Sequence, residues 1–353
     1  MAIIPASQVA RRRLSVAARR LGTSNPVDSI GGLLDRSFEL PAGDPRYGRN
    51  ALAPGSMPIE HSFSEIAAGT LRLDMEPLGP LATPGARQQE VSREMRRLVQ
   101  QNYGRQALAW FDERSEPWRS GRVHGGARFG AWFGAGFDEG GLHEAKVYYE
   151  LPDGGLDDLP PNLQHASRVA LSCLPKLQPI FTSIAAGRAQ GAQRIYFFHR
   201  GDLRLLDLEP LMNRLGIGHQ LPGLLTAVGL ILGGRFTLPE GSVVLALRET
   251  SRGMEMKLEI LLPAIADPPR EMHGLIQMHL AQRPDSQRAL RNWIQAMSLD
   301  EGAETCGQIS VVSVRVSPQT GSRLTLYFRP TGYERAPSRS RSVPDDPYAA
   351  AMQ

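Results

Sequence analysis

One short segment, AKVYYEL at residues 145–151, constrains the fold because two kinds of side chain alternate along it. Successive side chains of a β-strand point to opposite faces. Lys146 and Tyr148 would therefore share one face of a strand, whereas Val147 and Leu151 would share the other. One face is cationic and aromatic, and the opposite face is apolar.

The same alternation recurs in other predicted strands, where a cation is followed two residues on by an aromatic or polar group. The strands concerned are RIYFF (194–198), MEMKLEILL (254–262) and RLTLYFR (323–329). A solvated sheet face would account for one such strand, but recurring tyrosines are not what such a face requires. The repetition favours polar faces that turn toward a common interior.

The segments between these strands have the apolar spacing of helices. We predict helices over residues 6–22, 27–37, 86–113, 162–189 with a break near Pro175, 208–215, 221–232 and 270–298. Antiparallel hairpins that alternate with helical segments cannot form the parallel sheet of a nucleotide-binding fold. The pattern predicts an α+β fold, an antiparallel β-barrel of repeated αββα units with helices outside and a polar lumen.

The chain of 353 residues is expected to form a single barrel over residues 1–333, with a helical N-terminal segment over 1–40. Residues 334–353 are rich in Ser, Pro and Arg and are predicted to be a disordered tail.

Composition narrows the class of protein. With 41% hydrophobic and 22% charged residues and a net charge of +4, the chain resembles an ordinary globular protein. This charge is too weak to favour nucleic-acid binding. No apolar run is long enough to span a membrane, the basic start lacks the apolar core of a secretory signal, and two cysteines outside any CxxC pair suit a reducing compartment. A cytoplasmic protein is expected.

Metal and nucleotide motifs are missing from the sequence. Asp157 and Asp158 are followed by no third acid, so an aspartate-rich DDxxD motif that could hold a metal is not formed. No His and Cys cluster has metal-ligand spacing, and no GxSxG or GxxxxGK[ST] motif occurs. We expect no metal and no cofactor.

Taken in order, the strand motifs resemble those of the aromatic prenyltransferases of the αββα (ABBA) barrel type, in particular the indole, dimethylallyltryptophan synthase-like branch. They are PIEHSF (58–63), LRLDMEP (71–77), KVYYEL (146–151), RIYFF (194–198), MKLEI (256–260) and RLTLYF (323–328). The resemblance implies a prenyl diphosphate as co-substrate and an aromatic acceptor.

By this resemblance Glu60 would lie beside the acceptor, accept a hydrogen bond from an indole N–H and help to remove a proton. The cations that would bind the diphosphate are Arg72, Lys146, Arg194, Lys257 and Arg323. The rings that would shield the allyl cation are Tyr148, Tyr196 and Tyr327. The chain departs from the family pattern at Glu259, where a shielding tyrosine is expected, and in AWFGAGF (131–137), which lacks the lysine that fungal tryptophan enzymes carry near the acceptor.

These residue types suit the chemistry. Cleavage of the carbon–oxygen bond of an allyl diphosphate leaves a cation and an anionic leaving group, so the catalyst must stabilise separated charge. Lys and Arg can bind the diphosphate, tyrosine faces can stabilise the cation, and a carboxylate can take the proton that the acceptor ring loses.

The sequence therefore predicts an enzyme that transfers a dimethylallyl or longer prenyl group to an electron-rich aromatic acceptor without a metal. Two alternatives stay open. One is a peptide-modifying prenyltransferase, and the other is a non-catalytic barrel that binds a lipid or an anionic ligand. No nucleic-acid or membrane partner is expected, and the protein would be a monomer or a homodimer.

Overall fold

Ten antiparallel strands close into a barrel in the computed structural model, which describes residues 4–121, 123, 125–151, 155–189, 191–298 and 306–330. Around the barrel the strands follow the order β1-β12-β11-β10-β9-β6-β5-β4-β3-β2. They are β1 (Ile59–Ser64), β2 (Leu71–Met75), β3 (Ala131–Asp138), β4 (Gly141–Glu150), β5 (Leu177–Gly187), β6 (Ala192–His199), β9 (Val243–Thr250), β10 (Gly253–Leu261), β11 (Gln308–Ser317) and β12 (Thr320–Arg329). The predicted antiparallel barrel is confirmed.

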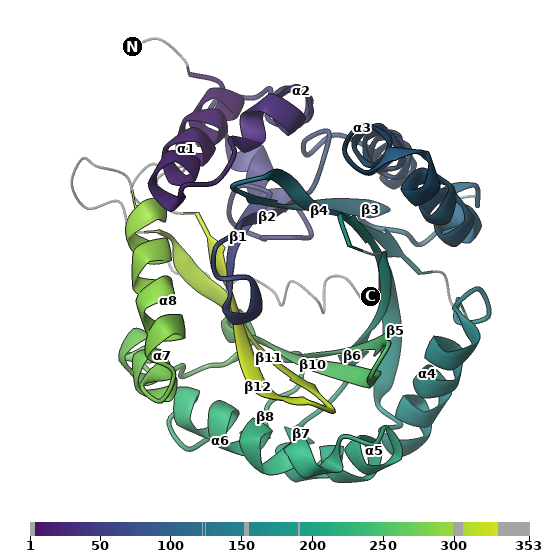
Figure 1. Cartoon of the computed structure of the whole chain (residues 1–353), viewed down its shortest axis with the longest axis vertical. Coiled ribbons are helices and arrows are strands. Elements are labelled where there is room, and N and C mark those ends of the chain that lie inside the picture. The colour runs from purple at the N-terminus through teal and green to yellow at the C-terminus, as the bar shows by residue number, and fades with distance from the viewer. Residues whose placement is uncertain are drawn as a thin grey trace.

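Helices surround the barrel and cover the outer faces of its strands (Figure 1). They are α1 (Ala6–Leu21), α2 (Pro26–Ser37), α3 (Pro84–Arg119), α4 (Pro161–Cys173), α5 (Glu209–Arg214), α6 (Leu221–Ile231), α7 (Met272–Leu280) and α8 (Pro284–Met297). A separate two-stranded sheet pairs β7 (Leu203–Arg204) with β8 (Thr237–Leu238). The predicted tail, 334–353, lies outside the described residues.

The main hydrophobic core lies between the barrel wall and these helices, because the apolar side chains of each strand point outward. Trp293 of α8, for example, is fully buried against Phe328 and Phe63 of the barrel, with ring centroids 4.7 Å and 6.4 Å apart. With the apolar faces directed outward, the polar faces of the strands line the lumen.

The prediction of helix over residues 162–189 is wrong in its second half. Helix α4 ends at Cys173, and the chain then forms strand β5. In this strand Phe181 and Ser183 lie on the lumen face, while Thr182 and Ile184 lie on the outer face, which is the period of a strand. Strand β5 joins β4 to β6, so the barrel closes through it.

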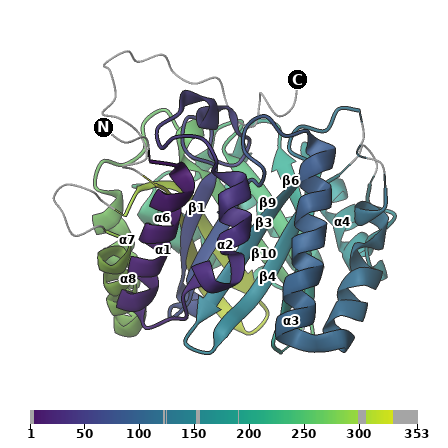
Figure 2. The same ribbon diagram turned by 90° about the horizontal axis from the view of Figure 1, so that it is seen from above.

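The long helix predicted over 86–113 is a pair of helical segments in α3. Gly104 has φ 84° and breaks the helix, a conformation that glycine adopts without steric cost. The second segment folds back beside the first (Figure 2), and Arg96 and Asp112, one from each, form an ion pair of 2.8 Å.

Candidate active site

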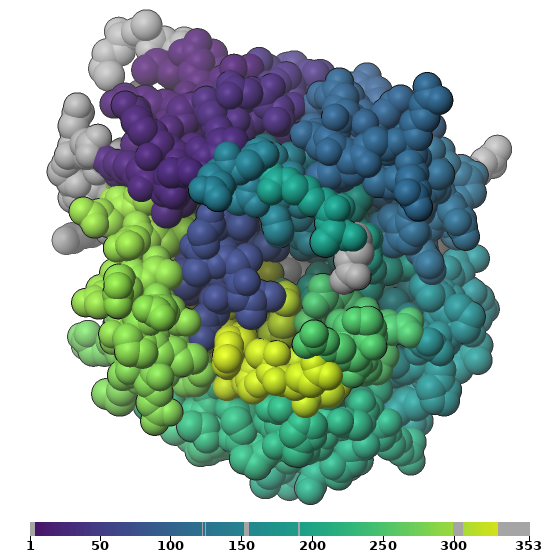
Figure 3. Space-filling model, in the orientation of Figure 1, coloured from purple at the N-terminus to yellow at the C-terminus, as the bar shows by residue number. Residues whose placement is uncertain are grey.

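Cations gather at the end of the lumen where the strands meet in hairpin turns. Lys146 of β4, Arg194 of β6 and Lys257 of β10 are buried, and Arg72 of β2 is partly buried. Four of the five cations that the sequence assigned to a diphosphate therefore lie within one lumen. The face shown in Figure 3 is hollowed at its centre, between segments that belong to the barrel.

The fifth cation, Arg323 of β12, lies apart from these contacts. Its Nε is 3.8 Å from Oε1 of Glu65, a residue of the short 3-10 helix Glu65–Ala67 that follows β1. Glu65 also pairs with Arg283 near the start of α8, at 2.6 Å. The structure thus places Arg323 at the rim of the barrel, beside a carboxylate that faces the helical layer.

Acidic side chains lie among the lumen cations, and the sequence interpretation did not include them. The first, Glu144, is partly buried. Glu144 of β4 lies 3.3 Å from Lys146 and 3.6 Å from Arg72. Burial alone would raise the pKa of the Glu144 carboxyl, but Lys146 and Arg72 lower this pKa to about 2. The sequence could have indicated this pair, because Glu144 is two positions before Lys146 and therefore lies on the same face of the strand.

Glu255 of β10 is the second such carboxylate. Its two oxygens accept hydrogen bonds of 2.6 Å from Arg194 and from Arg248 of β9, and Nε of Arg315 in β11 lies 3.4 Å away. Arg248 and Arg315 enlarge the cationic group beyond the residues that sequence reasoning identified. Both lie on the lumen face, since Arg248 pairs with Arg194 and Arg315 pairs with Lys257 across neighbouring strands.

The three tyrosines assigned to the cation shield lie in the same lumen. Tyr148 and Tyr196 have ring centroids 6.0 Å apart. Lys146 Nζ lies 5.5 Å from the centroid of Tyr148. Lys257 Nζ lies 4.9 Å from the Tyr327 ring and donates a hydrogen bond of 2.6 Å to its hydroxyl. The lysines thus join the cationic group to the aromatic one.

Lys257 also donates to Glu259, the carboxylate that stands where the family pattern has a tyrosine. Lys257 and Glu259 are two positions apart, so their side chains are neighbours on the same face of β10. Burial lowers the pKa of Lys257, and the neighbouring carboxylate Glu259 opposes this shift.

Additional aromatic side chains extend the lumen lining beyond the tyrosines and were not identified from the sequence. The rings of Phe129 and Trp132 are stacked with their centroids 3.8 Å apart, and the ring centroids of Phe181 and Tyr196 are 4.4 Å apart. The buried side chain of Phe198 belongs to the same cluster. Trp132 donates through Nε1 to Glu76 at 3.2 Å, which fixes the indole plane. These rings form an apolar end of the lumen, opposite the arginines.

Glu60 of β1 lies in the lumen wall and is 6% exposed. It is directly opposite Asp74 of β2, and its Oε1 accepts a hydrogen bond of 2.8 Å from Ser310. Burial raises the pKa of Glu60 to about 7, even though the Ser310 hydrogen bond and the charge of Arg329 lower it. The carboxyl can therefore gain and lose a proton near neutral pH.

The Asp74 carboxylate fills a space that a side chain at Gly134 of the neighbouring strand would otherwise occupy. It accepts a hydrogen bond of 3.0 Å from the Tyr148 hydroxyl, and burial raises its pKa. A Cβ at Gly134 of β3 would come within 2.3 Å of the Asp74 carboxylate. Gly134, in the AWFGAGF segment, thus leaves room for the Asp74 carboxylate.

Among the described residues, no group of three or more His, Cys, Asp or Glu side chains is arranged to hold a metal ion. No described helix is both long enough and apolar enough to cross a membrane.

No protein-family model and no curated protein sequence matches this chain. Several solved structures do match. A 6-dimethylallyl tryptophan synthase superimposes with a TM-score of 0.73 at 17% identity, over 96% of this chain and 100% of that chain. The 5-dimethylallyltryptophan synthase from Streptomyces coelicolor gives a TM-score of 0.68 at 16% identity, over 95% and 100%.

A third match is the ternary complex of the prenyltransferase PriB with L-tryptophan and dimethylallyl thiolodiphosphate, with a TM-score of 0.67 at 18% identity over 97% of this chain and 100% of that chain. The likeness extends over almost the whole chain and agrees with the closed barrel of ten antiparallel strands and its outer helices. The chain therefore has the fold of the ABBA-type aromatic prenyltransferases.

Proposed function

We propose that this protein transfers a prenyl group from its diphosphate to an electron-rich aromatic acceptor, with an indole as the leading candidate. The observation that carries the proposal is the lumen, in which buried lysines and arginines, tyrosine faces and a carboxylate with a raised pKa meet. The structural neighbours named as dimethylallyltryptophan synthases support the same substrate class.

The donor diphosphate would bind among the cations at the hairpin end of the lumen, chiefly Arg72, Lys146, Arg194 and Lys257. Charge-assisted hydrogen bonds from these side chains would stabilise the negative charge that develops as the carbon–oxygen bond breaks. Arg248 and Arg315 would extend this binding surface. Arg323 would act from the rim, because its side chain lies beside Glu65.

The allyl cation would form beside the tyrosines. Ring faces stabilise a desolvated cation by about 2 kcal/mol or more, and Tyr148, Tyr196 and Tyr327 would also keep water from the cation. The aromatic end of the lumen, with Trp132 and Phe181, would hold the acceptor against it.

The carbon–oxygen bond would break first, with its electron pair leaving on the diphosphate, and the acceptor carbon would then form its new bond to the allyl cation. The arenium intermediate then loses a proton, and Glu60 would accept that proton or hold the acceptor N–H. A base with a pKa near the working pH serves this role best, and the pKa of Glu60 is raised to about 7.

We further propose that the reaction requires no divalent metal, because fixed side-chain cations supply the positive field. The test is incubation with dimethylallyl or geranyl diphosphate and a panel of indoles, phenols and indole-containing peptides, with products identified by mass. The same assay in excess chelator should retain most of the activity. Loss in chelator that magnesium restores would contradict metal independence, and absence of product throughout would favour a barrel that only binds its ligand.

A further inference from the structure

A carboxylate occupies the arginine cluster of the lumen. Arg194 of β6, Arg248 of β9 and Glu255 of β10 are successive cross-strand partners, so their side chains lie side by side on the lumen face. Arg315 reaches the same carboxylate from β11. Three arginines from three strands therefore converge on one acid.

The contacts of Glu255 are close and buried. The side chains of Arg194 and Glu255 are 7% and 5% exposed, and both oxygens of Glu255 are engaged at 2.6 Å by Arg194 and Arg248. Burial opposes ionisation of Glu255, yet Arg194, Arg315 and Arg248 lower its pKa to about 2. Glu255 is thus a carboxylate at any working pH.

The arginines have donors that this carboxylate does not use. Among the described residues, the buried Nε–H groups of Arg72, Arg194 and Arg248 have no hydrogen-bond acceptor. A guanidinium presents its donors in a rigid fork that suits the oxygens of phosphate groups. The cluster can therefore bind an additional multivalent anion through these unused donors, but the negative charge of Glu255 repels that anion.

We propose that Glu255 is an internal counter-ion of the diphosphate site, which holds Arg194, Arg248 and Arg315 together and lowers the affinity of the site for diphosphate. This inference rests on the proposed function, because it assumes that a diphosphate binds among these cations. Its consequence is a site that is organised before the donor arrives and that releases the diphosphate product readily.

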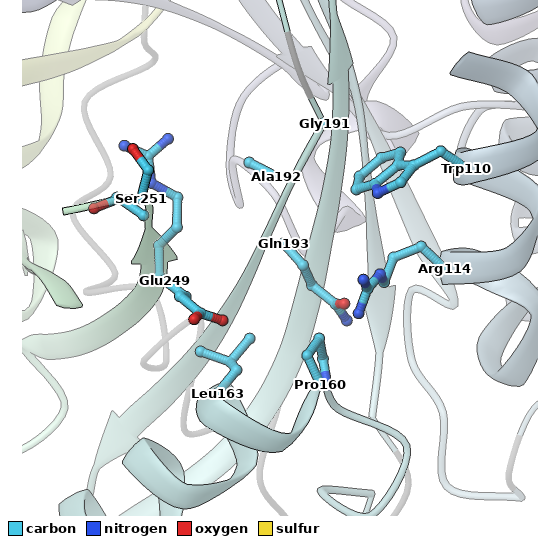
Figure 4. Close-up of a pocket in the computed structure, with 11 residues that line it drawn as sticks. Trp110, Arg114, Pro160, Leu163, Gly191, Ala192, Gln193, Glu249 and Ser251 are labelled. Carbon is cyan, nitrogen blue, oxygen red and sulfur yellow. The ribbon is translucent and has the colours of Figure 1, made fainter. Parts of the chain in front are cut away.

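A groove on the outside of the barrel provides the control for the experiment. The groove has a volume of about 290 Å³ and is lined by Trp110 and Arg114 of α3, by Gln193, and by Arg248 and Glu249 of β9 (Figure 4). Glu249 is exposed and accepts a hydrogen bond from Asn162. It follows Arg248 directly in β9, so its side chain lies on the opposite face of the strand from the arginine cluster.

The test is calorimetric titration of the whole protein with inorganic diphosphate, which carries no prenyl group. Glu255→Gln keeps the shape of the side chain and removes its charge, and we expect it to bind diphosphate roughly tenfold more tightly or better, since about 1.4 kcal/mol corresponds to a factor of ten. The control Glu249→Gln makes the same change in net charge and should bind as the wild type does. Unchanged or weaker binding by Glu255→Gln would overturn the proposal.

A second pair of variants keeps the test decisive if Glu255→Gln folds poorly once three arginines lose their counter-ion. Arg315→Gln is compared with Arg315→Gln/Glu255→Gln, in which one cation and one anion have been removed together. The double variant should bind diphosphate roughly tenfold more tightly than Arg315→Gln, for the reason given above. Equal affinities in this pair would also overturn the proposal.

Failure of the counter-ion role can be told apart from failure of the proposed reaction. If the wild type prenylates an aromatic acceptor but the glutamine variants gain no affinity for inorganic diphosphate, only the counter-ion role is wrong. If the variants gain affinity while no acceptor is prenylated, the counter-ion role stands and the proposed reaction is wrong.

Discussion

Glu60 and Asp74 are direct cross-strand partners in β1 and β2, so two carboxyl groups lie next to each other in the lumen wall. Burial raises the pKa of Glu60, and the nearby charge of Asp74 raises this pKa a little further. The two groups have different partners, since Ser310 donates to Glu60 and Tyr148 donates to Asp74. Burial raises the pKa of both carboxyls, and Glu60 is the one whose role as a base the variant Glu60→Gln tests.

The variant Glu60→Gln keeps the shape of the side chain and removes its basicity. We expect turnover to fall by roughly a hundredfold or more, the usual size of a general-base contribution. Binding of inorganic diphosphate should stay at the wild-type value, because Glu60 carries no diphosphate contact. Product formation and calorimetry on the same preparations check both statements. Full activity in the variant would remove Glu60 from the mechanism.

The pH dependence of the reaction should report the same carboxyl. With its pKa raised to about 7, mainly by burial, Glu60 is increasingly protonated below that pH and can no longer act as a base. The rate should therefore fall on the acid side of about pH 7. Ser310→Ala removes a hydrogen bond that lowers this pKa, so the acid limb should move to higher pH. A limb that stays in place would show that another group controls it.

Stability should depend on pH through Glu60 in the opposite sense from an ion-paired carboxylate. Its pKa is about 7 in the folded protein and 4.5 ordinarily, so the unfolded chain gives up the proton first as pH rises. The wild type should therefore lose stability relative to Glu60→Gln between about pH 4.5 and 7. Denaturant unfolding of both proteins at pH 4 and pH 8 measures this difference. Equal differences at the two pH values would contradict the raised pKa.

Much of the barrel could be predicted because strand alternation is a local property of the sequence. Lys146 and Tyr148 share a face wherever the strand lies. Strand β5 could not be recognised in this way, because both of its faces are largely buried and its apolar run has the composition of a buried helix as well. Only its pairing with β6, across a short turn, and with β4, on the other side of α4 in the sequence, identifies it as a strand.

The types of side chain in the candidate site could be predicted from the sequence, but the ion pairs between them could not. The face of each cation follows from its position on a strand. Glu255 meets Arg315 only because β10 and β11 pair, although the two residues are 60 positions apart in the sequence and no local rule fixes the register of these strands. For Arg323 the strand face alone was a poor guide to its contacts. It has the lumen parity of Tyr327, yet it lies at the strand end, where Glu65 is within reach.

The variants Lys146→Ala and Arg194→Ala should weaken donor use more than acceptor use. Each removes a buried cation from the region assigned to the diphosphate, and a hydrogen bond to a charged group contributes about 1.5–3 kcal/mol. Donor KM should therefore rise, or kcat fall, by roughly tenfold or more. Arg204→Ala is the matched control, because Arg204 is exposed and pairs with Asp207 outside the barrel. Wild-type donor kinetics in both lumen variants would refute the assignment.

Tyr327 allows the aromatic shield to be tested separately from its hydrogen bond. Its hydroxyl accepts from Lys257 at 2.6 Å, and its ring lies 4.9 Å from the same ammonium group. Tyr327→Phe removes the hydroxyl and keeps the ring, whereas Tyr327→Leu removes both. If the ring stabilises the allyl cation and keeps water away, by about 1–2 kcal/mol, Tyr327→Leu should raise the ratio of prenyl alcohol to prenylated product several-fold and Tyr327→Phe should not. Mass analysis of both products measures the ratio. A wild-type ratio in Tyr327→Leu would exclude the shielding role, and an equal increase in both variants would assign the effect to the hydroxyl and Lys257.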